Sequence, residues 1–134
     1  MGAKKHNKAE ERKEAKRNRY VARLRNFPTS PRKMRLMADL IRGEEVEKAL
    51  QILKYSPQAA AGHMYKLLLS AIANWQVKNE GARMEEAQLF VKEVRVDSAR
   101  ILKRIQPRAQ GRANRIRKRS NHVTLELDSK VKNS

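Results

Sequence analysis

The sequence predicts an α+β fold: three helices packed on a small three-stranded antiparallel sheet, with a long protruding basic β-hairpin. Two observations carry this prediction. Apolar residues recur at helical spacing between residues 31 and 78, whereas alternating or β-branched apolar residues mark three strands elsewhere. The segment 103–119 contains eight Lys and Arg residues and no acidic residue, and a Pro and a Gly near its centre predict a turn.

The composition favours a polyanionic partner. The 134 residues suit one domain and carry a formal net charge of +18, which argues against a small-molecule enzyme. Residues 1–26 hold ten basic and three acidic side chains, and residues 101–134 hold ten and two, so the excess lies at the two ends. Without cysteine, apolar membrane span or signal peptide, we expect a cytoplasmic protein with no disulfide and no membrane partner.

The chain divides into one domain and two terminal segments. We expect a single globular domain over residues 19–128, with the extended hairpin at about 99–118. Residues 1–18 form a basic extension without an apolar stripe; a nascent helix and a solvated tail are the alternatives, and we expect disorder in the free protein. Residues 129–134 form a C-terminal tail.

The first strand and the first helix have clear local signals. A short strand-like run ends at Phe27-Pro28, and in it Tyr20, Ala22 and Leu24 alternate with Val21, Arg23 and Arg25. Ser30 suits the N-cap of the next helix and Pro31 its first position, where the missing N–H is not needed. Gly43 is expected to end that helix.

Two further helices follow in the middle of the chain. Glu44 and the nearby acidic residues open a short helix, where their charge suits the helix dipole. The Ser56-Pro57 pair repeats the cap-plus-proline pattern and predicts the start of the longest helix, from about Gln58 to Lys78. Helical spacing assigns its buried face to Met64, Leu67, Leu68, Ala71, Ile72 and Trp75.

The last two sheet strands enclose the basic hairpin. The apolar residues from Leu89 to Val96 change phase near Lys92-Glu93, which predicts either a bulge or a change of the exposed face. A second alternating run surrounds Leu125. A two-stranded ribbon is marginal in water, and its charges repel one another. A phosphate backbone would neutralise and order it; the alternative is a disordered basic tip with no specific partner.

The candidate binding residues are basic side chains on the first strand, at the start of the first helix and along the hairpin. Arg offers bidentate phosphate geometry, and a helix N-terminus also favours phosphate. The nucleic-acid-binding candidates are Arg23, Arg25, Arg32, Lys33, Arg35, Lys103, Arg104, Arg108, Arg112, Arg115, Arg117, Lys118, Arg119 and His122. No catalytic residue, cofactor or metal ligand is predicted, because the three histidines are far apart and no nucleotide-binding loop is present.

Several short segments share the order and spacing of one known family. In the globular part they are Ser30–Lys33, Ala38–Gly43 and Ser70–Asn74, and in the hairpin and its exit they are Lys103–Ile105, Pro107–Ala109, Gly111–Ala113 and Lys118–Val123. Over roughly residues 20–127 the chain resembles the bacterial large-subunit ribosomal protein twenty-two family. The resemblance implies a structural protein that contacts ribosomal RNA and neighbouring ribosomal proteins and takes part in subunit assembly.

The resemblance also implies that the hairpin lines the nascent-peptide exit tunnel. The tunnel-lining tip carried over by position comprises Ile105, Gln106, Pro107, Arg108, Ala109, Gln110, Gly111 and Arg112. Gln106 and Gln110 stand where other members often carry Met and Lys. A competing hypothesis is an architectural DNA-binding protein whose ribbon enters a groove. That hypothesis needs a dimer to present two arms, and the sequence shows no extra apolar face for one.

Overall fold

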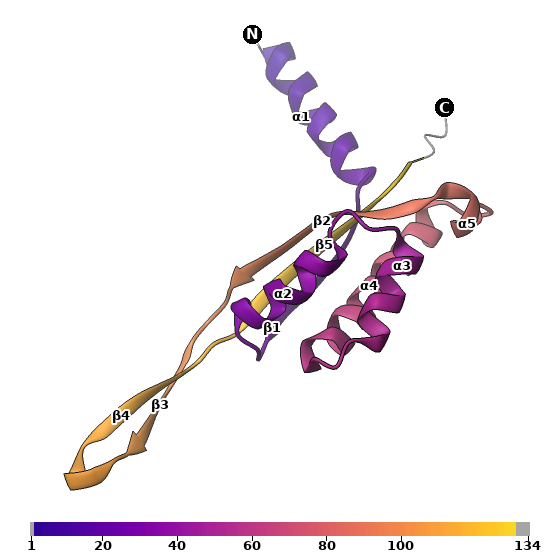
Figure 1. The fold of residues 1–134 in the computed structure, drawn as a ribbon. Helices are drawn as coiled ribbons and strands as arrows, with labels where there is room; N and C mark the ends of the chain where they lie inside the picture. The colour runs from indigo at the N-terminus through magenta and orange to yellow at the C-terminus, as the bar shows by residue number, and fades with distance from the viewer. Residues whose placement is uncertain (1, 131–134) are drawn as a thin grey trace.

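The computed structural model describes residues 2–130 and gives only the backbone of Met84 and Glu85. It has one antiparallel sheet, a separate two-stranded hairpin and helices, so the α+β class is confirmed (Figure 1). The sheet has the order β1-β5-β2, and its strands are β1 (Tyr20–Phe27), β5 (Asn121–Ser129) and β2 (Leu89–Ser98). The hairpin consists of β3 (Leu102–Pro107) and β4 (Ala113–Lys118).

The predicted three-stranded antiparallel sheet and separate hairpin are confirmed, but the predicted count of three helices is too low. Besides α2 (Pro31–Ile41), α3 (Val46–Tyr55) and α4 (Ala59–Lys78), the structure contains α1 (Gly2–Arg17) and the one-turn α5 (Met84–Ala87). α1 buries no residue, so its sequence has no apolar stripe from which a helix could be predicted. α5 is too short to show a helical period. The predicted C-terminal tail lies mostly outside the described residues, at 131–134.

Helix boundaries follow capping chemistry at some ends and not at others. The Ser30 Oγ accepts a hydrogen bond from the Lys33 backbone N–H at 3.4 Å, which confirms the predicted N-cap of α2. Gly43, with φ of +81°, follows this helix, as expected. The prediction for Ser56 is wrong: Ser56 ends α3, and Gln58 is the N-cap of α4. A Ser-Pro pair between two helices is ambiguous because Ser suits both an end and a start.

Strand β5 is the centre of the sheet and pairs antiparallel with both neighbours. The register of β2 on β5 shifts between Val91 and Glu93, which confirms the predicted bulge. The turn between α2 and α3 is attached to β2 by two backbone hydrogen bonds of 2.9 Å, from Gly43 N to Val91 O and from Val91 N to Glu44 O. The helices are therefore fixed to the sheet by backbone contacts as well as by side-chain packing.

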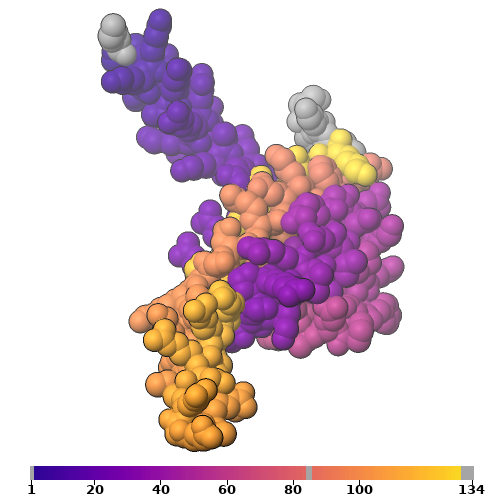
Figure 2. Space-filling view, turned by 60° about the vertical axis from the view of Figure 1, so that its left-hand side comes forward, coloured from indigo at the N-terminus to yellow at the C-terminus, as the bar shows by residue number. Residues whose placement is uncertain are grey.

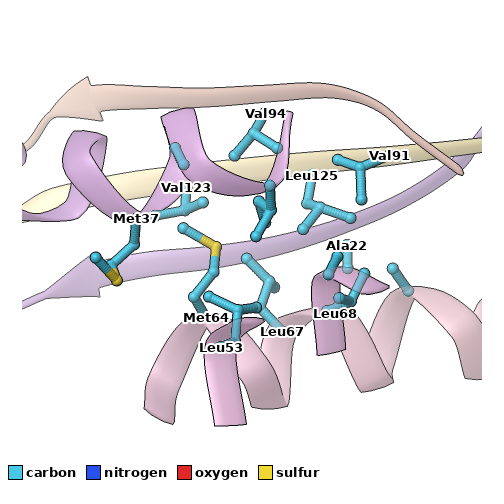
Figure 3. Packing of buried hydrophobic residues seen from close by; sticks show 14 of the residues in the cluster. Ala22, Met37, Leu53, Met64, Leu67, Leu68, Val91, Val94, Val123 and Leu125 are labelled. Carbon is cyan, nitrogen blue, oxygen red and sulfur yellow. The ribbon is translucent and has the colours of Figure 1, made fainter. Parts of the chain in front are cut away.

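The core lies between one face of the sheet and helices α2, α3 and α4 (Figures 1 and 3). Met37, Leu53 and Met64 come from three different helices and meet Val94 and Leu125 of the sheet. The predicted stripe of α4 is confirmed, since all six of its residues are buried. The opposite face of the sheet is left to polar and charged side chains, which include Arg23 and Arg25.

Leu68→Ala should destabilise the fold because Leu68 is 0% exposed and its truncation leaves a cavity in the core. We expect a loss of about 2–5 kcal/mol in the free energy of unfolding, measured by denaturant titration. Leu69→Ala is the matched control, because Leu69 is 43% exposed on the same helix. Equal effects of the two substitutions would contradict the assigned buried face of α4.

Candidate nucleic-acid interface

The hairpin presents basic side chains on both of its faces. Lys103 lies opposite Arg117 and Ile105 opposite Arg115, so these four residues share one face. The adjacent pairs, Arg104 with Ile116 and Leu102 with Lys118, occupy the other face. Every residue of β3 and β4 is exposed, so neither face packs on the protein. An anionic partner can therefore contact the hairpin from either side.

The hairpin has little internal stabilisation. The pair Lys103 and Arg117 places like charges directly opposite each other, which destabilises a two-stranded sheet. Ile105 is 71% exposed and has no apolar layer to cover it. Because a lone ribbon is marginal even without such repulsion, neutralisation by phosphate would stabilise this conformation.

A tight turn closes the tip. Arg108 N donates to Arg112 O at 2.7 Å, across a short 3-10 turn formed by Ala109–Gly111. Gln110 and Gly111 have φ values of +61° and +70°, so two consecutive residues adopt the left-handed conformation. Gly tolerates this conformation at no steric cost, which explains its place in the turn.

Asn121 anchors the base of the hairpin, a role that was not predicted. This residue is 0% exposed, and its Nδ2 donates to Thr29 O at 2.6 Å, just before the N-cap of α2. The backbone bond from Ala99 N to Ser120 O, at 3.0 Å, closes the base from the other side. The sequence shows only that a polar residue interrupts the apolar pattern of a strand. It cannot show the partner, because Thr29 is 92 residues away in the chain.

Three of the predicted binding residues meet on the uncovered face of the sheet. Arg23 and Arg25 of β1 and His122 of β5 line one shallow pocket with Thr124. The Asn26 backbone N–H donates to Nδ1 of His122 at 3.0 Å. The neutral imidazole must then carry its proton on Nε2, so that atom can donate to an acceptor such as a phosphate oxygen.

The predicted residues at the start of α2 divide into two groups. Arg32 and Lys33 are exposed beside the helix N-terminus, where backbone N–H groups also attract anions. Arg35 instead directs its Nη2 to the carbonyl oxygen of Val96 in β2, at 3.2 Å. Arg35 therefore links the helix to the sheet close to the hairpin base, a role that its sequence pattern did not reveal.

A partly buried ion pair holds the start of β1 against β5. Two guanidinium nitrogens of Arg19 donate to the Glu126 carboxylate at 3.1 and 2.7 Å, and the Glu126 side chain is only 7% exposed. These hydrogen bonds lower the pKa of Glu126 against the opposing effect of burial, and the charges of Arg19, Lys92 and Arg95 lower it further. The same bonds raise the pKa of Arg19. This pair was not predicted.

Neither a metal-binding cluster nor a membrane-spanning helix is found among the described residues. Among them, no group of three or more His, Asp and Glu side chains is placed to hold a metal ion. No helix of residues 2–130 has the length and apolar character needed to cross a membrane. A basic arm exposed on both faces, next to basic residues on the sheet and at a helix N-terminus, defines a nucleic-acid-binding α+β protein.

Comparison with known proteins identifies the family within this class. The model of the family described as ribosomal protein L22p/L17e matches residues 22–128. The chain belongs to this family, which confirms the predicted resemblance and makes it a structural protein rather than an enzyme.

Several bacterial relatives match nearly the full chain, and each is described as large ribosomal subunit protein uL22. The relative from Christiangramia forsetii is 65% identical over 95% of this chain and 94% of its own length. The relative from Porphyromonas gingivalis is 59% identical over 96% of each chain. The relative from Bacteroides fragilis is 58% identical over 99% of this chain and 97% of its own.

The Arg19–Glu126 pair predicts a specific acid sensitivity. The pKa of Glu126 is lower in the folded protein than its ordinary value of 4.5, so its contribution to stability is complete above that value. The contribution is lost as the pH falls through the folded-state pKa, because the carboxylate becomes protonated.

Glu126→Gln should therefore destabilise the protein at pH 7, and its deficit relative to the wild type should shrink in acid. Denaturant titrations of both proteins along a pH series would measure this. Asp97→Gln, at an exposed carboxylate of the neighbouring strand, is the control. A deficit that stays constant with pH would contradict the role assigned to the pair.

Proposed function

We propose that this protein is a structural constituent of the large ribosomal subunit in the cytoplasm, where it binds ribosomal RNA and supports subunit assembly. Family membership and the subunit named for its relatives support this function. The single observation that carries it is the hairpin, which is exposed along its whole length and basic on both faces. Neighbouring ribosomal proteins are the other expected partners.

The two-sided hairpin favours insertion into RNA over lying on its surface. A ribbon that binds one groove needs basic residues on the face that meets the groove, whereas its other face remains in solvent. Here Arg115 and Arg117 lie on one face and Arg104 and Lys118 on the other. Phosphates on both sides would neutralise all four, and each contact would release condensed counterions.

The hairpin base and the hairpin tip have different proposed roles. Near the base, Arg117, Lys118 and Arg119 join the exposed Arg32 and Lys33 of the globular domain as RNA anchors. The tip, residues 105–112, includes the uncharged residues Ile105, Gln106 and Gln110 and projects farthest from the domain (Figure 1). We assign this tip to the wall of the exit tunnel, with the nascent peptide as its neighbour.

Arg115→Gln and Arg117→Gln should each weaken association with large-subunit RNA. Each substitution removes one phosphate contact, so the slope of log affinity against log salt should flatten by roughly 0.7 to 0.9. Filter-binding titrations at several salt concentrations would measure the slope. Lys48→Gln, on the exposed surface of α3, is the control with the same change of charge. Unchanged slopes for both hairpin variants would exclude phosphate contact at these positions.

Deletion of residues 105–112 should leave incorporation into subunits intact, because the base and the globular domain retain their basic residues. The expected change is in the tunnel wall, and therefore in the passage of nascent chains or the binding of tunnel-directed drugs. Subunits purified from cells that carry only the shortened protein would decide the matter. Absence of the protein from those subunits would assign the anchoring role to the tip instead.

A further inference from the structure

Helix α1 leaves the body as a solitary rod that packing does not explain. None of its 16 residues is buried, and it projects away from the globular domain (Figures 1 and 2). Helices of this length are marginal in water when isolated, and most helices in proteins are stabilised by a packed apolar face. α1 has no such face, so the reason for its sequence must be sought in its charges.

Four basic residues of α1 form one row along the helix, and no acidic residue lies in that row. Lys5, Lys8, Arg12 and Lys16 follow one another at intervals of three, four and four residues, which places them in one row along the helix. We call these four residues the basic stripe. Glu10 and Glu14 lie on the opposite side at 3.6 residues per turn.

The basic stripe has no partner among the residues that the structure describes. Across residues 2–130, no hydrogen bond or ion pair involves any of its four side chains, whereas Lys13, outside the stripe, contacts Glu10 at 3.2 Å. α1 has no apolar side chain larger than Ala, so it lacks the apolar face with which an amphipathic helix inserts into a membrane. The geometry of these four unpaired cations therefore matches a partner with regularly spaced negative charges.

The C-terminal end of α1 is held in a defined position on the domain. The Lys78 Nζ of α4 donates to the carbonyl oxygens of Arg17 and Arg19, at 2.9 and 2.6 Å. Arg19 is held in turn by Glu126. At this junction Lys16 and Arg23 line one cleft between β1 and α4, so the stripe continues into the basic face of the sheet.

We propose that the basic stripe binds the phosphate backbone of a double-helical segment of ribosomal RNA, separate from the RNA contacted by the hairpin. The inference rests on the proposed function and extends it to residues that the family match, 22–128, does not cover. From Lys5 to Lys16 the stripe is about 16 Å long, enough to follow several phosphates. α1 contains no Phe, Tyr or Trp on which unpaired bases could stack, which favours a duplex backbone over a single strand.

A lysine footprint tests which side of α1 faces the RNA. The full chain, free and bound to large-subunit RNA, is treated with an amine-acylating reagent and mapped by mass spectrometry. RNA should protect Lys5, Lys8 and Lys16 and leave Lys13 reactive. Equal reactivity of all four lysines with and without RNA would overturn the proposal, as would equal protection of Lys13 and the stripe.

Paired substitutions test whether the stripe adds to affinity. Lys5→Gln with Lys8→Gln should flatten the salt slope of RNA binding by about 1.5, for two lost contacts. The control combines Lys48→Gln with Lys54→Gln, two exposed lysines of α3. Gln retains helix propensity at both sites. An equal loss in the control would show that only total charge matters and would overturn the proposal.

The hairpin variant Arg115→Gln separates failure of this inference from failure of the proposed function. Wild-type binding by the stripe variant, together with weakened binding by the hairpin variant, would overturn the inference and leave the proposed function standing. Wild-type binding by both variants would overturn both.

Discussion

The pairing of β5 with both β1 and β2 positions every other functional part of this protein. β2 and β5 continue past their last pair, Ser98 with Asn121, into the two arms of the hairpin, so the direction of the hairpin is set by the sheet. On the other side, β1 lies against β5 and carries α1 at its start. One central strand thus fixes the orientation of both projections relative to the core.

Stability and binding are assigned to different parts of the chain. The apolar side chains that α2, α3 and α4 bury against the sheet supply the favourable free energy of folding. The hairpin and α1 bury none of their own residues and concentrate like charges. We therefore expect their conformations to depend on counter-charge and the core to be independent of it. This division lets the basic arms be shaped for a polyanion without weakening the domain that carries them.

The two projections extend in different directions from the domain (Figure 2). With the hairpin inserted between phosphates and the basic stripe of α1 on a second RNA segment, the rigid domain between them would hold two RNA segments at a fixed spacing. The ion pair of Arg19 with Glu126 and the hydrogen bonds from Lys78 make the α1 junction resistant to bending. Asn121 has the same effect at the hairpin base, through its bond to Thr29 O.

Short-range patterns in the sequence were sufficient for much of the fold and for the outline of the site. Some features depend only on residues close together in the chain, so a periodic or capping pattern predicts them. They are the buried stripe of α4, the Ser30 cap, the bulge near Lys92-Glu93 and the basic hairpin. For residues 1–18 a helix stayed one of two alternatives, because a helix without a buried face has no apolar period. The prediction for Ser56 was wrong because capping signals at adjacent helix ends overlap.

Only the tertiary structure decided what the polar residues do. Arg19 and Glu126 are 107 residues apart, Asn121 and Thr29 are 92 apart, and Arg35 reaches Val96 across 61 residues. No local pattern encodes such partners, because the pairing exists only after the strands have aligned. The sequence alone determined that the chain is basic, α+β and equipped with a hairpin. In the folded protein, some basic side chains bond to backbone carbonyls or carboxylates and stabilise the fold, whereas the others remain available to bind phosphate. Which side chains do so depends on the acceptors that the folded sheet places within hydrogen-bonding distance.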